Sequence, residues 1–119
     1  KFIKAEVDPR GFRSVTISRK GNLFTGYAFY HPDEKTPFGE KFGCHIAEIR
    51  ANIKYLKHRI EINRIRKQTL EGFKKDLENT LELGPNPILE KLNQHIEYYK
   101  KEIEHNKRDI YLAKTTIQE

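Results

Sequence analysis

The sequence contains a single cysteine, no methionine, no tryptophan and no long apolar run. With only one thiol, Cys44, the chain cannot form an internal disulfide, which is typical of a protein in a reducing cytosol. No stretch approaches the roughly 18–20 apolar residues of a membrane-spanning helix, and the first residues lack the apolar core of a signal peptide. We therefore expect a cytoplasmic protein that does not enter a membrane.

Motifs of common enzyme classes are missing as well. Gly21 and Gly26 stand alone, so the sequence has neither a phosphate-binding loop nor a dinucleotide fingerprint. No group of cysteines and histidines has the spacing of a zinc site. His45 follows Cys44 directly, and because neighbours on a helix point about 100° apart, the two do not form a nucleophile–base pair. The sequence predicts no catalytic residue, no metal and no cofactor, and therefore a protein that is not an enzyme.

Positive charge is what the sequence has in excess. Lys and Arg number 23 against 17 Asp and Glu, which gives a formal net charge of +6 over 119 residues. A basic excess favours anionic partners such as nucleotides, nucleic acids or acidic proteins. The same excess is also within the range that small domains carry for solubility. The length fits a single domain, residues 1–119.

Residues 1–35 have the pattern of a small antiparallel sheet. Turn residues separate three segments that alternate apolar and polar residues or are rich in aromatics: Phe2–Val7, Phe12–Arg19 and Leu23–Tyr30. Lys20-Gly21-Asn22 predicts a tight hairpin turn between the last two. In the third segment Tyr27 and Phe29 share one face, whereas Phe24 and Tyr30 share the other. We therefore expect one face to pack on a helix and the other to contact a partner chain or a ligand.

Residues 36–119 have the pattern of a long antiparallel two-helix hairpin. We predict a first helix from about Pro37–Glu40 to Leu81 and a second from Pro87 to about Thr116. The apolar stripe of the second helix has the alternating four- and three-residue steps of a heptad: Ile88, Leu92, Ile96, Tyr99, Ile103, Asn106, Ile110 and Ala113. Its members pair across the loop in one constant register: Leu77 with Leu92, Phe73 with Ile96, Leu70 with Tyr99 and Leu56 with Ala113. The predicted fold class is α+β, a small sheet followed by a helical hairpin.

The same register places two polar residues opposite each other. Asn63 of the first helix falls across from Asn106 of the second, in a stripe that is otherwise apolar. The first stripe is irregular here, since Ile62 and Ile65 fall off it. A buried polar pair costs stability but fixes register and partner choice. The alternative is that both asparagines border a solvated gap where the helices splay.

Arginines are the candidate anion ligands, because a guanidinium can bind phosphate through two parallel hydrogen bonds and lysine cannot. Arg50 falls near the sheet end of the hairpin, and the register places Arg108 near Ile60 and Glu61. With the arginines of the sheet they could line an anion pocket. Salt bridges to the many glutamates are the alternative.

Two stretches of the chain, Phe24–Glu34 and Gly43–Lys54, resemble a known family. The first has the pattern G-x-A-x-x-x-P-x-D/E at a strand exit, and the second has I-A-x-x-R-A-x-I-K on a helix. The pair resembles small phage proteins of the Thoeris anti-defence family, first type, whose architecture agrees along almost the whole chain. One departure is the aromatic pair Phe29-Tyr30, which stands where the family usually has a small residue before the proline.

The resemblance implies a sponge that works in the host bacterial cytoplasm. Proteins of this family bind the glycocyclic ADP-ribose signal made by TIR-domain enzymes and hold it uncleaved, which blocks TIR-based (Thoeris) immunity. They form dimers or larger homo-oligomers with pockets between subunits. By their chemistry, six residues are our candidates for the diphosphate, the adenine and the ribose: Arg50, Arg108, Phe73, Leu83, Asn86 and Asn93. Only Arg50 lies inside the resembling stretches.

Two other functions stay open: a coiled-coil module that inhibits a host protein, and a basic phage protein that binds nucleic acid. Lysines that alternate with acidic residues, as in Lys74-Lys75-Asp76, weaken a continuous phosphate track, so nucleic acid is not the expected partner. The register places Arg50 toward the sheet but Phe73, Asn86 and Asn93 toward the loop. We therefore expect a second chain to supply half of the pocket.

Overall fold

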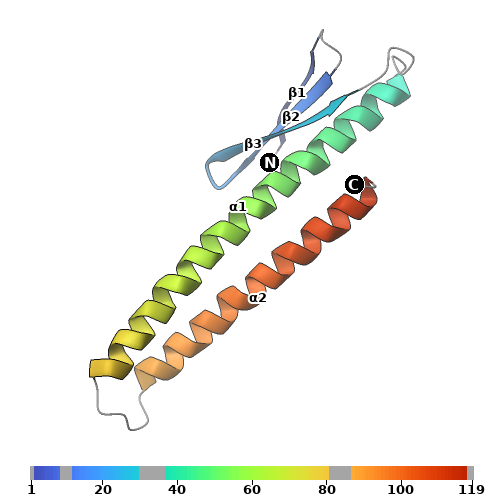
Figure 1. Cartoon of the computed structure of the whole chain (residues 1–119). Helices are drawn as coiled ribbons and strands as arrows, with labels where there is room; N and C mark the ends of the chain where they lie inside the picture. Colours follow the sequence, from blue (N-terminus) through green and yellow to red (C-terminus); the bar gives the residue numbers. More distant parts are fainter. Residues whose placement is uncertain (1, 9–11, 30–36, 81–86, 118–119) are drawn as a thin grey trace. The chain divides into compact units, whose positions relative to one another are not determined.

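The computed structural model describes residues 2–8, 12–29, 37–80 and 87–117. It confirms the α+β class: a three-stranded antiparallel sheet is followed by two helices that form a hairpin (Figure 1). The elements are β1 (Phe2–Asp8), β2 (Phe12–Arg19), β3 (Asn22–Phe29), α1 (Pro37–Thr80) and α2 (Pro87–Thr116). All five were predicted, with ends that agree to within about a residue. None of the described helices is both long enough and apolar enough to cross a bilayer.

Contacts divide the chain into two units. The first comprises Lys1–Lys57 and Asp109–Glu119, and the second comprises His58–Arg108. Each unit therefore contains part of both helices, and the sheet belongs wholly to the first.

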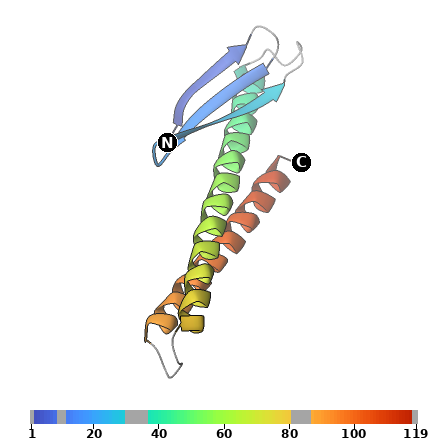
Figure 2. The ribbon, with the colours of Figure 1, turned by 60° about the vertical axis from the view of Figure 1, so that its left-hand side comes forward.

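The sheet has the order β1-β2-β3, so β2 is its central strand (Figure 2). β2 and β3 pair from Phe12–Phe29 to Arg19–Asn22 and are joined by a two-residue turn. Both turn residues have positive φ, 51° at Lys20 and 82° at Gly21. That is the conformation of a type I′ hairpin turn, whose twist matches that of the strands. The predicted hairpin is confirmed.

The core of the first unit lies between the sheet and the start of α1. Val15 and Ile17 of β2 and Ala28 of β3 are buried against Ala47 and Ala51 of α1. Four partly buried side chains border this cluster: Phe24, Cys44, Ile46 and Tyr55. Since Phe24 meets Tyr55 edge to face at 5.6 Å between ring centroids, the prediction that one face of the third strand covers a helix is confirmed.

The opposite face of β3 carries exposed apolar side chains. Leu23 is 66% exposed, Tyr27 46% and Phe29 81%. Tyr30, which the alternation predicts to share a face with Phe24, lies outside the described residues.

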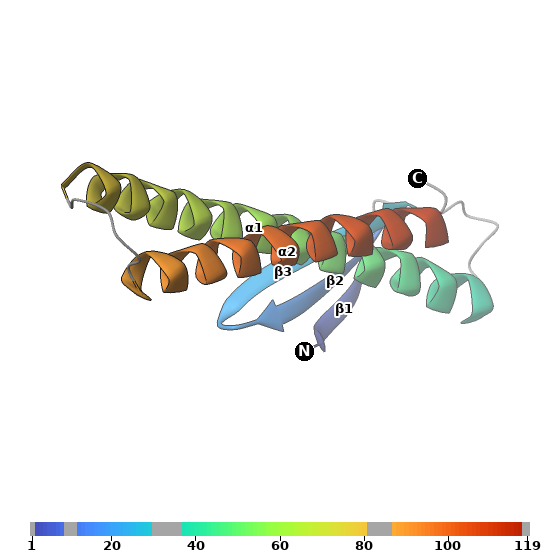
Figure 3. The ribbon, with the colours of Figure 1, turned by 90° about the horizontal axis from the view of Figure 1, so that it is seen from below.

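In the second unit, His58–Arg108, segments of α1 and α2 lie side by side and antiparallel (Figures 1 and 3). Asn63 donates a hydrogen bond to Asn106 at 3.3 Å, and the two residues are only 1% and 8% exposed. The predicted polar pair is therefore confirmed as a buried contact, and the solvated gap is not what the structure shows.

The α1 stripe of this unit is more regular than the sequence suggested. Buried or partly buried residues follow one another at steps of three and four: Ile60, Asn63, Lys67, Leu70, Lys74 and Leu77. Two seam positions are lysines, whose methylene stems can pack on apolar neighbours while the ammonium group stays in water. Their ammonium groups reach Glu71 and Glu78, at 3.1 and 3.8 Å. Charged residues at heptad positions made the stripe look irregular.

Two predicted seam residues are wrong. Phe73 and Ile88 are both 60% exposed, whereas Lys74 and Leu89 beside them are half-buried. Heptad spacing gives the reason, since four residues on from Leu70 is Lys74 and three residues back from Leu92 is Leu89. In both places the sequence offered a larger apolar residue one position away from the true seam.

Candidate ligand-binding site

The six predicted site residues do not form one cluster in the structure. Arg50 belongs to the unit that contains the sheet, whereas Phe73, Asn93 and Arg108 belong to the unit His58–Arg108. Leu83 and Asn86 lie outside the described residues. The surroundings of the four described residues are therefore considered within each unit.

Arg50 lies where β3 crosses α1. At this crossing the two backbones approach so closely that a Cβ on Gly26 would overlap the Ala47 carbonyl and the Ala51 amide. Arg50 donates from Nη1 to the Tyr27 carbonyl at 2.8 Å. One turn further along α1, Lys54 donates from Nζ to the Thr25 carbonyl at 2.6 Å.

These two bonds cap the outer edge of β3. The other edge of the strand pairs with β2, so the Tyr27 and Thr25 carbonyls face away from the sheet and are satisfied by side chains of α1. An edge strand with open backbone groups invites pairing with another chain. Two cations bound to its carbonyls protect this edge and place positive charge along it.

A cation and an aromatic ring meet at the same place. The Lys54 ammonium lies 5.2 Å from the centroid of the Tyr27 ring, within the range of a cation–π contact. Beside them, the hydroxyls of Thr16 and Thr25 share a hydrogen bond of 2.8 Å across β2 and β3. Lys54 is not among the predicted site residues, although Lys54 is the last residue of the second stretch that carries the family resemblance.

The resembling stretches have a packing role in this chain. Gly26, Ala47 and Ala51 permit the close crossing of strand and helix, and Arg50 with Lys54 caps the strand edge. Gly43 leaves room for the buried side chain of Arg13, which is 1% exposed. A Cβ at position 43 would lie 2.8 Å from Nη1 of Arg13. The described parts of the two stretches, Phe24–Phe29 and Gly43–Lys54, are therefore a strand and a helix packed directly on each other.

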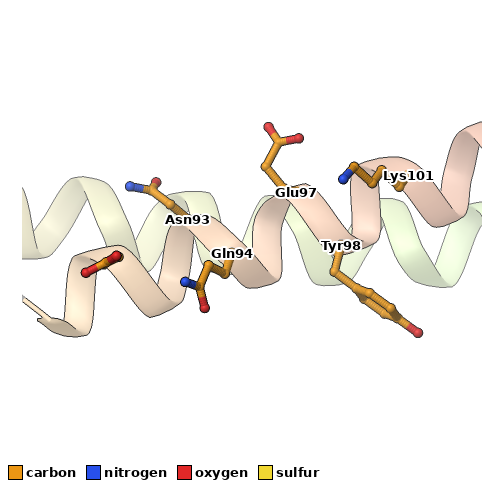
Figure 4. A pocket seen from close by; sticks show the side chains of 6 residues that line it. Asn93, Gln94, Glu97, Tyr98 and Lys101 are labelled. Carbon is orange, nitrogen blue, oxygen red and sulfur yellow. The ribbon is translucent and has the colours of Figure 1, made fainter.

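Asn93 borders a shallow hollow of about 490 Å³ on α2, also lined by Gln94 and Tyr98. Figure 4 shows Asn93 and Glu97 projecting from one side of the helix and Gln94 and Tyr98 from the other. Glu90 and Glu97 also line the hollow, opposed by one cation, Lys101. Two carboxylates make this hollow by itself a poor site for a phosphate group.

Arg108 is exposed on α2. The predicted neighbour Glu61 is bound instead by Arg64 of its own helix, which donates two hydrogen bonds of 2.6 and 2.8 Å from Nη2 and one of 3.1 Å from Nε. This bond holds the pKa of Glu61 below its ordinary value of 4.5 and raises the pKa of Arg64. Arg64, which was not among the candidate arginines, therefore forms the ion pair with Glu61, whereas Arg108 lies at the surface.

Phe73 lies at the surface of α1, and other large apolar side chains of the same unit are exposed with it. Ile65 is 52% exposed and Tyr98 57%. Within the described part of this unit the buried side chains are those of Asn63 and Asn106, and no apolar side chain is fully buried.

Among the described residues no group of three or more His, Cys, Asp or Glu side chains could hold a metal ion. The sequence matches no protein-family model, no curated protein and no solved structure.

Proposed function

We propose that this chain is a phage anti-defence protein that binds and sequesters a cyclic ADP-ribose-type nucleotide without cleaving it, as a homodimer or larger homo-oligomer in the host cytoplasm. The family resemblance supplies the ligand class. The observation that supports an oligomeric binding protein is the packing of the unit His58–Arg108, which buries two asparagines and no apolar side chain in its described residues.

Two helices bury little surface by themselves, and four-helix bundles solve this by covering each hairpin with another. A second copy of the hairpin would cover exposed side chains such as Ile65 and Phe73. The same contact would bring Asn93 and Arg108 of one copy near those of the other. Cations of the second copy would also offset the negative charges of Glu90 and Glu97 beside Asn93. The pocket would then be complete only between copies.

A binding experiment tests this proposal. The purified chain is mixed with glycocyclic ADP-ribose, unbound ligand is removed, and the nucleotide released by heating is identified by mass spectrometry. We expect intact ligand in a fixed ratio to protein, and light scattering should give the mass of a dimer or larger oligomer. Recovery of a hydrolysed nucleotide would identify an enzyme, and recovery of none would refute the sponge.

Matched variants separate the residues. Phe73→Ser and Arg50→Gln should each weaken nucleotide binding at least tenfold. Tyr111→Ser removes an aromatic side chain that is 69% exposed on α2, and Lys57→Gln removes an exposed cation of α1. These two controls should bind as the wild type does. Equal losses in the variants and their controls would show that the proposed residues do not form the site.

A further inference from the structure

The face of the sheet that points away from α1 combines aromatic rings, hydroxyls and cations. Side chains alternate between the two faces of a strand, so Leu23, Thr25, Tyr27 and Phe29 share this face of β3. The register adds Ser14, Thr16 and Ser18 from β2. Tyr27 and Phe29 are 46% and 81% exposed. We propose that this face binds single-stranded nucleic acid, with bases stacked on Tyr27 and Phe29 and the phosphates near Lys54.

Ring spacing argues for a single strand. Residues two apart in a strand are about 6.7 Å apart, roughly twice the 3.4 Å rise per nucleotide along one strand of B-DNA. Neighbouring bases of a stretched single strand can each meet one ring at this spacing. Bases stacked inside a duplex cannot. Base–aromatic stacking tolerates any sequence, because every base has a π face.

Charge on this face also favours an anionic polymer. Lys54 donates a hydrogen bond from Nζ to the Thr25 carbonyl at 2.6 Å, and its ammonium group lies 5.2 Å from the centroid of the Tyr27 ring. Arg50 lies one helical turn away at the same strand edge. On β1, Lys4 projects from this face, and its neighbour Glu6 is neutralised by their ion pair of 3.1 Å. The ion pair balances the Glu6 carboxylate, and Lys54 and Arg50 place two further cations at the edge of β3.

The polar residues of the face fit the same ligand. Thr16 and Thr25 hold each other's hydroxyls at 2.8 Å and leave Thr16 only 7% exposed. The Thr25 carbonyl accepts the hydrogen bond from Lys54, whose ammonium group lies over the Tyr27 ring. A row of small hydroxyl side chains beside two exposed rings leaves room for bases.

Fluorescence anisotropy with labelled 12-mers of thymidine and of uridine tests the inference. We expect binding at low salt that weakens as salt rises, with a slope of about two to three released counterions. Phe29→Ser and Tyr27→Ser should each weaken binding about 5- to 150-fold, as expected for the loss of one stacked base. Lys54→Gln should weaken binding and lower the salt slope by about one.

Controls make each outcome decisive. Tyr111→Ser removes a ring of similar exposure from α2 and should bind the 12-mers as the wild type does. Phe29 is so exposed that its removal leaves the core intact, so its effect does not depend on folding. Absence of oligonucleotide binding by the wild type would overturn the inference. The inference would also be overturned if the Phe29→Ser and Tyr27→Ser variants bound the 12-mers normally but had a different oligomer mass. The face would then be an interface between protein chains. Neither result bears on sequestration of the cyclic nucleotide, which is measured separately.

Discussion

Asn63 and Asn106 form a buried hydrogen bond of 3.3 Å between the two helices of the hairpin. Four ion pairs in the described parts of these helices join residues of the same helix, at spacings of three or four. Such pairs support a helix but do not align one helix with another. In the described part of the hairpin, the two asparagines form a buried polar pair between the helices, and such a pair favours one register over others.

Replacing one asparagine should lower the free energy of unfolding more than replacing both. Asn63→Leu leaves the Asn106 amide buried without its partner, and we expect the free energy of unfolding to fall by about 1–3 kcal/mol. The double replacement with leucine should recover most of this loss and yield a wider range of oligomers. Urea unfolding of both single variants and the double variant gives the coupling energy. Additive effects would show that the two amides do not interact, and exposed Asn79→Leu is the surface control.

Gly26 is the residue on which the packing of β3 against α1 depends. A methyl group there would overlap backbone atoms of Ala47 and Ala51, which cannot move as a flexible side chain could. We expect Gly26→Ala to lower the free energy of unfolding by at least about 3 kcal/mol or to abolish folding of the sheet unit. Circular dichroism and thermal unfolding provide the measurement.

Gly72 supplies the matched control for Gly26. It lies on the exposed side of α1, and a Cβ there meets nothing within 4 Å. Gly72→Ala should raise the free energy of unfolding by about 0.5–1 kcal/mol, because alanine is the better helix former. If the two substitutions had similar effects, the close crossing at Gly26 would not exist in solution.

Glu61 should make stability weakly dependent on acid pH. The hydrogen bond from Arg64 lowers the pKa of Glu61 below 4.5 in the folded chain, so the pair stabilises the fold at pH values above the unfolded pKa. This contribution is lost as the pH falls through the lowered pKa. Wild type and Glu61→Gln should therefore differ slightly in unfolding free energy at pH 7 and converge in acid. Arg64→Gln should give the same profile, and a difference that persists in acid would exclude this pair as its cause.

The elements of the fold followed from short-range patterns, which is why they were predicted well. Alternation gave β2, and Pro37 and Pro87 marked the helix starts. The heptad of α2 placed Asn106 opposite Asn63. The exact seam of α1 could not be found by the same means, because Lys67 and Lys74 occupy seam positions through their methylene stems. An apolar neighbour such as Phe73 then looked like the better candidate.

The site was harder to predict because its contacts are between side chains and backbone. Nothing in the types of Arg50 and Lys54 shows that they bind carbonyls of a strand more than 20 residues earlier. Their spacing of four on one helix, next to Ala47 and Ala51, was the available signal. Alanines repeated at four residues indicate a surface where another backbone comes close. Arg50 and Lys54 have the same spacing of four and lie beside these alanines, so their side chains reach the edge of the strand that packs on the helix.

The two seam lysines give a last prediction about the hairpin. Their side chains are about one-third exposed, so leucine at either position would bury additional apolar surface against α2. We expect Lys74→Leu to raise the free energy of unfolding by about 1 kcal/mol. Lys75→Leu, on the exposed side of the helix, should stay within about 0.5 kcal/mol of the wild type. A charged residue in a seam also disfavours alternative helix pairings, so Lys67→Leu/Lys74→Leu should be more stable yet form oligomers of mixed mass. Light scattering alongside urea unfolding measures both effects. Equal stabilities of Lys74→Leu and Lys75→Leu would place Lys74 outside the seam.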